Sequence, residues 1–212
     1  MKPQTVLLWA WIAIVTVLVC IGVYINNNSY ADEPQEDNLS YFEIAIFELV
    51  RREDLRLEKY MCPAGKPTIG VGLQTDSFNN ITFQQAKDLL YIDFQNRYDV
   101  IAQLLPNHSR NQIMAVTLFA HNVGINRLQS YPQWKRILNQ TSDVSEKWLE
   151  YSYYTPPNGK PRFSDNLAKA RSLEVMLWEN DIKGLKHMRD SLKKETTRIY
   201  EKAINDARSN MY

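Results

Sequence analysis

Cysteine, histidine and glycine are scarce in this 212-residue sequence, which contains two, three and seven of them, respectively. The few cysteines and histidines have none of the spacings of a zinc site, and no acidic loop is suited to calcium. The glycines form no phosphate-binding loop. We therefore expect neither a metal nor another cofactor.

The two cysteines do not indicate a disulfide. Cys20 lies inside a long apolar run, whereas Cys62 lies in a polar part of the chain. In a chain anchored through that run, Cys20 would be in lipid and could not reach Cys62; cleavage of the run would remove Cys20 altogether. Whether the two cysteines meet after release from a membrane is left open by the sequence.

An excess of charge of one sign is also missing. The chain has 25 basic and 24 acidic residues, and Lys2 is the only charged residue before position 32. This balance provides no basic surface of the kind that binds nucleic acid. We expect no nucleic-acid partner.

A long hydrophobic run, by contrast, is present near the N-terminus. Residues from Thr5 to Ile25 carry no charge and match the roughly 20 residues with which a helix spans a bilayer. Lys2 precedes the run and acidic residues follow it from Asp32, which predicts a single-pass membrane protein whose remaining chain is extracytoplasmic. A cleaved signal peptide is the alternative, because Ser29-Tyr30-Ala31 resembles a cleavage site. Both alternatives export the rest of the chain.

These patterns divide the chain into a transmembrane or signal-anchor segment (1–28), an acidic linker (29–39) and a domain (40–212). Within the domain, capping signals and apolar periodicity predict a mainly helical fold with one small hairpin. The predicted helices cover 41–53, 82–104, 110–123, 131–139, 145–153, 165–178 and a C-terminal extension from about 183 to 206, and the predicted hairpin covers 66–75.

Glu53 ends the first predicted helix and continues its apolar face, which contains Phe42, Ala45, Ile46 and Leu49. The usual interpretation of a glutamate at a helix end is a solvated surface residue. An acid that faces the interior is instead the group that general-acid cleavage of a glycoside requires. Periodicity alone leaves both interpretations open.

The residues from Glu53 onward resemble the active-site segment of the bacteriophage lysozyme (endolysin) family. The matching residues are Glu53, Arg56-Leu57, Tyr60, Cys62, Gly65 and Thr68-Ile69-Gly70-Val71-Gly72. Phe119 to Gly124 and Asn166 to Glu174 resemble two later elements of the same family, so the resemblance covers about residues 40–180.

The resemblance implies an α+β, lysozyme-like fold in which a small lobe and a larger helical lobe flank the substrate. It also implies a monomeric peptidoglycan hydrolase that cleaves the β-1,4 bond between N-acetylmuramic acid and N-acetylglucosamine without a cofactor. Glu53 would protonate the leaving oxygen, and Cys62 and Thr68 would position or activate a water on the opposite face of the sugar, with inversion. Because a neutral thiol is a poor base, Cys62 would rather orient the water or act as a thiolate.

Three further residues are candidates for substrate binding under this resemblance: Asn122, Lys169 and Arg171. Lys169 or Arg171 is also a candidate to pair with Glu53, although Arg171 could equally be an ordinary surface cation. We expect His121 to lie in the core, since its helix neighbours are aromatic and aliphatic.

The sequence also departs from the family pattern. Asp54 stands where the family usually has glycine, and Val71 and Leu73 replace a common tyrosine and histidine. These departures support one rival, a non-catalytic, membrane-anchored, peptidoglycan-binding protein that keeps the fold. Among catalytic versions, an endolysin released from its signal anchor and a permanently anchored wall-remodelling enzyme are both open.

Overall fold

The computed structural model describes residues 40–62, 65–156 and 159–209. The predicted transmembrane segment, the acidic linker and Cys20 lie outside these residues. Residues 41–212 form a compact unit of their own. None of the helices in the described part of the chain combines the length and the apolar character needed to cross a membrane.

Six predicted helices are confirmed, and their ends lie where the sequence signals place them. A capping box starts the second of them, because Thr82 accepts from the Gln85 N–H and Gln85 accepts in return from the Thr82 N–H. Gly124, at φ 86°, follows the end of the third. The confirmed helices are α2 (Tyr41–Glu53), α3 (Phe83–Leu104), α4 (Arg110–Val123), α6 (Pro132–Asn139), α8 (Asp165–Glu179) and α9 (Ile182–Ser209).

The predicted hairpin is present, but it belongs to a three-stranded antiparallel sheet in the order β1-β2-β3. β2 (Pro67–Gly70) and β3 (Leu73–Gln74) form the hairpin, and β1 (Arg56–Met61) pairs with β2. No sequence pattern indicates β1, because three of its six side chains are charged and four are exposed.

The predicted helix over 145–153 is wrong in its second half. α7 (Val144–Leu149) ends early, a 3₁₀ turn (Glu150–Ser152) follows, and Tyr153 begins a strand. That strand, β4 (Tyr153–Tyr154), pairs with β5 (Arg162–Phe163), and this second hairpin was not predicted. A short helix, α5 (Ile125–Leu128), was also not predicted.

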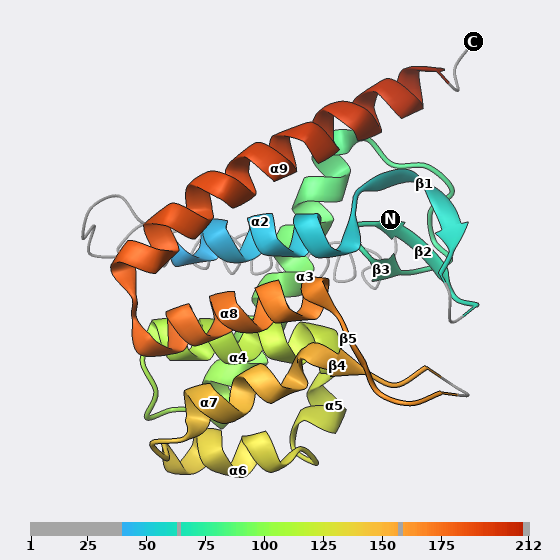
Figure 1. The fold of residues 1–212 in the computed structure, drawn as a ribbon. Helices are drawn as coiled ribbons and strands as arrows, with labels where there is room; N and C mark the ends of the chain where they lie inside the picture. The colour runs from blue at the N-terminus through green and yellow to red at the C-terminus, as the bar shows by residue number, and fades with distance from the viewer. Residues whose placement is uncertain (1–39, 63–64, 157–158, 210–212) are drawn as a thin grey trace, which may run out of the picture. The chain divides into compact units, whose positions relative to one another are not determined.

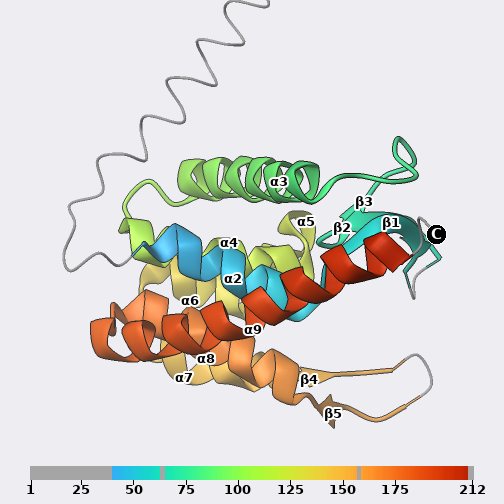
Figure 2. The ribbon, with the colours of Figure 1, turned by 90° about the horizontal axis from the view of Figure 1, so that it is seen from above.

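The core is centred on α4, in which every residue from Ile113 to Ala120 is buried. α4 packs against α2, α3 and α8, and α9 lies along α2 as far as β1 (Figures 1 and 2). The Thr196 hydroxyl of α9 donates to the Phe47 carbonyl of α2, 3.3 Å away. The sheet β1-β2-β3 therefore sits at the C-terminal end of α2, where Glu53 lies.

Candidate active site

Glu53 is the last residue of α2, and about a third of its side chain (32%) is exposed. Arg52 Nε donates to Glu53 Oε1 over 3.1 Å. On the other side lies Gly72, at φ 74°, where a Cβ would be 3.3 Å from Glu53 Oε2. Glycine thus permits both the backbone conformation and the close approach of the β2-β3 turn to Glu53. The acid is held between a helix end and a sheet turn, with one side open to solvent.

Asp54 is the residue at which the chain leaves α2. Its φ is 63°, a left-handed conformation that favours glycine and that aspartate tolerates better than most residues. Its N–H donates to the Val50 carbonyl, 3.0 Å away, and its Oδ1 accepts from the Leu55 N–H over 2.9 Å. The departure from the usual family glycine therefore keeps the backbone geometry that ends the helix at Glu53.

Cys62 and Thr68 are brought together by one backbone carbonyl. The N–H of Cys62 and the hydroxyl of Thr68 both donate to the Lys66 carbonyl, over 2.9 and 3.0 Å. Cys62 is half-buried, whereas Thr68 is only 2% exposed. Because the Thr68 proton is bonded to Lys66, its oxygen is left as an acceptor.

Tyr60 lies beside these residues, although no sequence pattern assigns it a role of its own. It pairs with Thr68 across β1 and β2, and the Arg56 guanidinium lies 4.4 Å from its ring centre. Burial raises the pKa of Tyr60; Arg56 opposes this, and the charges of Glu53 and Cys62 add to it. The phenol is therefore within electrostatic reach of Glu53 and Cys62, two of the three predicted catalytic residues.

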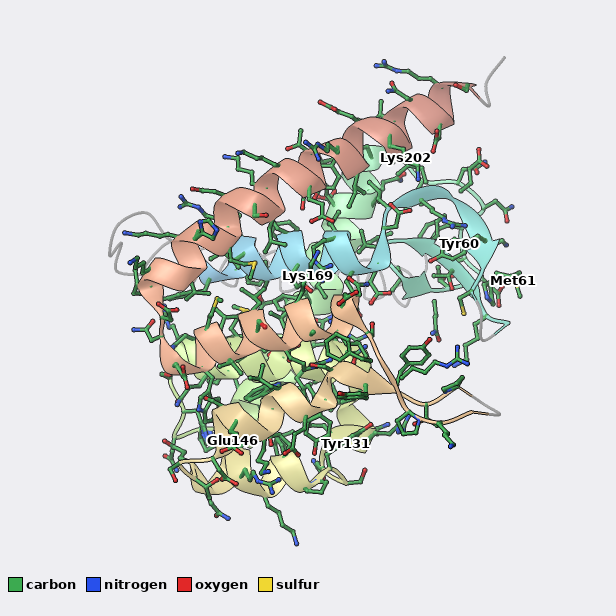
Figure 3. All side chains as sticks on the ribbon, in the orientation of Figure 1. Tyr60, Met61, Tyr131, Glu146, Lys169 and Lys202 are labelled. Atoms are coloured by element: carbon green, nitrogen blue, oxygen red, sulfur yellow. The ribbon has the colours of Figure 1, made fainter. Side chains whose placement is uncertain are left out.

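The three predicted substrate-binding residues, which lie on α4 and α8, differ in their exposure to solvent. Lys169 is exposed on α8 (Figure 3), and Asn122 is exposed near the end of α4. Arg171 is fully buried, and its Nη2 donates to Asn122 Oδ1 over 2.7 Å. The suggestion of an ordinary surface cation is therefore wrong for Arg171, and its burial leaves no surface for direct contact with a substrate. Asn122 and Lys169 stay predictions.

Arg171 pairs with Glu174 rather than with Glu53. Its Nη1 donates to Glu174 Oε2, which also accepts from Trp148 Nε1 over 2.8 Å. Its guanidinium lies over the Phe119 ring, 4.5 Å from the centre. Burial raises the pKa of Glu174, and the Arg171 charge opposes that rise. This cluster joins α4, α7 and α8 and is structural.

The cation that contacts Glu53 is Arg52, whose side chain is only 4% exposed. Its Nη2 lies 2.9 Å from His121 Nδ1. A guanidinium can only donate, so Nδ1 accepts and the His121 proton is on Nε2, which lies 3.8 Å from Asp93 Oδ2. Burial, followed by the charges of Arg52 and Arg97, holds the pKa of His121 well below its usual value. Neutral His121 therefore holds the Arg52 side chain in position, and Arg52 in turn holds the Glu53 carboxylate.

Sequence reasoning missed this chain of contacts because Arg52 and His121 are 69 positions apart in the sequence. His121 was correctly expected to be buried, but nothing local indicates that Arg52 turns inward beside it. Within the described residues, no group of three or more histidine, cysteine, aspartate or glutamate side chains is placed to hold a metal.

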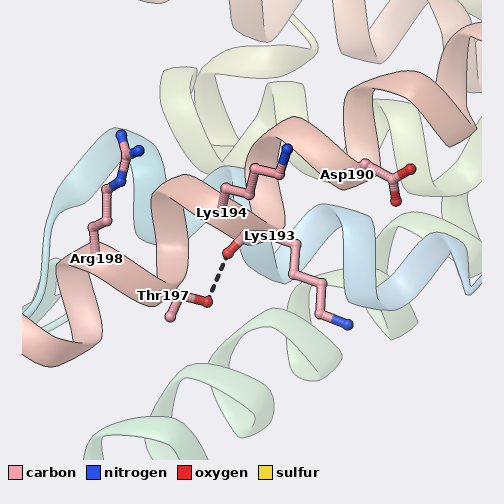
Figure 4. Close-up of a pocket in the computed structure, with 5 residues that line it drawn as sticks. All are labelled: Asp190, Lys193, Lys194, Thr197 and Arg198. Carbon is pink, nitrogen blue, oxygen red and sulfur yellow. Dashed lines mark hydrogen bonds between the residues drawn. The ribbon is translucent and has the colours of Figure 1, made fainter.

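A hollow also lies on α9, apart from these residues (Figure 4). It is lined by Asp190, Lys193, Lys194, Thr197 and Arg198. Thr197 Oγ1 donates to the Lys193 carbonyl over 2.9 Å, as is usual on a helix surface. The hollow contains none of the predicted site residues.

Comparison with known proteins decides the family. The phage lysozyme family model matches residues 50–174, more than half of the chain. The chain belongs to the phage lysozyme family. No curated protein matches it.

Solved structures of two phage endolysins and of one muramidase domain have the same fold at low sequence identity. The muramidase domain of SpmX from Asticaccaulis excentricus is 20% identical, with a TM-score of 0.56 over 63% of this chain and 93% of that one. The endolysin of Escherichia coli O157:H7 phage FAHEc1 is 24% identical (TM-score 0.53, 69% and 96% covered). The active form of the P1 phage endolysin Lyz is 18% identical (0.51, 76% and 94%). The predicted lysozyme-like α+β fold is confirmed.

Proposed function

We propose that this phage lysozyme family member is a muramidase. It cleaves the β-1,4 bond between N-acetylmuramic acid and N-acetylglucosamine in peptidoglycan, with Glu53 as the general acid. The observation that carries this proposal is the position of Glu53. It is a partly exposed acid at a helix end, held by Arg52 and next to the turn of the sheet that contains Thr68 and is followed at the end of β1 by Cys62. Family membership supports the substrate class.

In the proposed reaction, Glu53 gives its proton to the glycosidic oxygen as the C–O bond breaks. A water attacks the anomeric carbon from the opposite face and forms the new C–O bond. Its proton passes to bulk solvent, from which the Glu53 carboxylate is reprotonated. Thr68 Oγ1, whose own proton is bonded to Lys66, accepts a hydrogen bond from that water, and Cys62 orients it. The product has inverted anomeric configuration.

Purified full-length protein, compared with Glu53→Gln, tests the proposal. We expect the wild-type chain to release new reducing ends from isolated peptidoglycan and Glu53→Gln to release almost none. If both proteins release none but still bind peptidoglycan, the chain is the non-catalytic wall-binding protein, and the muramidase proposal fails.

The role of Cys62 is separately testable. The proposal uses the place of the Cys62 side chain, close to Thr68, to orient the water, and does not use a reaction of its sulfur. We expect Cys62→Asp to keep most activity and Cys62→Ser to lose part of it. Loss of activity in both variants would make the sulfur itself essential.

We further propose that residues 5–25 hold the chain in the cell membrane, with the catalytic domain on the extracytoplasmic, periplasmic side or released there. Support comes from the uncharged run and the charges that flank it. Mass spectrometry of the mature protein tests this proposal: an intact N-terminus is expected for an anchor, whereas a chain starting at Asp32 would show a cleaved signal peptide.

A further inference from the structure

The β4-β5 hairpin holds three large aromatic rings in solvent. Tyr153 is 56%, Tyr154 48% and Phe163 53% exposed. Tyr153 and Phe163 face each other across the two strands, with ring centres 5.4 Å apart and an angle of 72° between the rings. A cross-strand aromatic pair stabilises a hairpin, but that role does not require such exposure. Clustered exposed rings are typical of a ligand-binding surface.

The aromatic rings are exposed although the base of the hairpin is hydrogen-bonded to, and packed on, the helical body. The Ser164 N–H donates to the Ser152 carbonyl over 3.0 Å. The Ser152 hydroxyl donates to the Leu149 carbonyl over 2.7 Å. Tyr151, just before the hairpin, packs edge to face on buried Phe119. Tyr151 is thus packed against the core, whereas the rings of Tyr153 and Phe163 are exposed to solvent.

The hairpin also adjoins the candidate active site. It leads into α8, whose first turn contacts α2: Arg51 Nη2 donates to the Asn166 carbonyl over 3.3 Å. Arg51 is two residues before Glu53 on the same helix. Both the hairpin and the sheet β1-β2-β3 project from the side of the helical body on which α2 ends (Figures 1 and 2).

Charge on the hairpin fits a polymer that carries carboxylates. Lys160 and Arg162 are exposed, and no acidic residue occurs between 153 and 163. Peptidoglycan offers pyranose rings, whose C–H faces stack on aromatic rings, together with carboxylates on its peptides.

We infer that the β4-β5 hairpin is a binding subsite for the glycan strand of peptidoglycan, outside the residues that cleave it. Tyr153 and Phe163, which share one face of the hairpin, stack against sugar rings. Lys160 and Arg162, of which Arg162 pairs with Tyr154 on the other face, supply positive charge that attracts the peptide carboxylates. The inference rests on the proposed function in one respect, that peptidoglycan is the ligand.

Binding without catalysis tests this subsite. In full-length Glu53→Gln protein, co-sedimentation with isolated peptidoglycan is compared for Tyr153→Ala/Phe163→Ala and for the aromatic replacement Tyr153→Phe/Phe163→Tyr. We expect roughly tenfold weaker binding for the alanine pair and near-normal binding for the aromatic pair. Tyr91→Ala is the matched control, because it removes a ring of similar exposure (42%) from α3.

The inference is overturned if the alanine pair binds as tightly as its Glu53→Gln parent, or if that parent does not bind peptidoglycan at all. In the chain with Glu53 intact, the same alanine pair should raise KM for peptidoglycan about tenfold and change kcat less than about twofold. Hairpin-dependent binding without any hydrolysis would refute the muramidase proposal and leave the subsite standing, so the two failures are distinguishable.

Discussion

At the scale of single residues, the position of Glu53 depends on a side chain that the family motif does not include. Arg52 contacts Glu53 with one nitrogen and His121 with another, and it is almost completely buried. A contact that orients a catalytic acid changes the rate more than it changes stability, because small displacements of reacting groups are costly.

We predict that Arg52→Gln lowers kcat by between about tenfold and a hundredfold. Substrate binding should change little, since Arg52 itself is buried. Steady-state kinetics on peptidoglycan measure both quantities. Arg97→Gln is the control: Arg97 pairs with Asp93, at the far end of the same chain of contacts. If Arg52→Gln only lowered the melting temperature and left kcat intact, the positioning role would be refuted.

His121 supplies a prediction about pH. Its pKa is held well below the usual value by burial and by the charges of Arg52 and Arg97, with Asp93 the nearest acid. The unfolded chain therefore protonates this histidine first, and stability falls as pH drops from about 6.5 towards the lowered pKa, by up to about 1.4 kcal/mol per pH unit. Above that window the effect is absent.

Urea unfolding between pH 7 and pH 5 measures this dependence. His121→Gln should reduce the slope of unfolding free energy against pH, whereas His187→Gln, at an exposed histidine of α9, should not. An unchanged slope in His121→Gln would mean that Nδ1 does not act as a buried acceptor.

At the scale of elements, the end of α2 is set by the left-handed residue that follows Glu53. Asp54→Gly should be neutral or stabilise the fold by up to about 1 kcal/mol, because glycine adopts this conformation without strain. Asp54→Ala should cost about 1 to 2 kcal/mol. The Lys202 partner of Asp54 is 66% exposed, so loss of that ion pair adds little to either value. The unfolding free energies of the two variants test this prediction. Equal values for Asp54→Gly and Asp54→Ala would show that the left-handed conformation at residue 54 causes no strain.

The face of α8 that packs on α4 and α7 contains a buried ion pair within the helix, between Arg171 and Glu174. Arg171→Met should destabilise the fold by about 3 to 5 kcal/mol, because Glu174 would be left buried without its cation. Arg171→Met/Glu174→Leu should recover most of that loss. Chemical denaturation of both variants tests this; a double variant as unstable as the single one would show that the pair itself stabilises the helix contact.

At the scale of the whole molecule, the elements with local signals were predictable. Thr82 with Gln85 and Gly124 mark helix ends, and the spacing from Phe42 to Glu53 shows the buried face of α2. β1 and the β4-β5 hairpin were not predictable, because most of their residues are exposed and form no alternating apolar pattern. At the site, the motif residues were found, whereas the Arg52–His121 contact joins helices that only the folded chain brings together.

The family resemblance also placed Arg171 near the substrate, and burial corrects that. A motif gives the type of a residue, but it does not say whether the side chain binds a ligand or supports the core. Arg171 supports the core, because its guanidinium packs on Phe119, which in turn contacts Trp148.

The most direct test of the central claim is identification of the products that the full-length protein releases from peptidoglycan. After borohydride reduction and mass spectrometry, we predict fragments whose reduced end is N-acetylmuramic acid, and their near-complete loss with Glu53→Gln. Fragments with reduced N-acetylglucosamine ends, or unchanged release by Glu53→Gln, would contradict the assignment of Glu53 as the general acid of a muramidase.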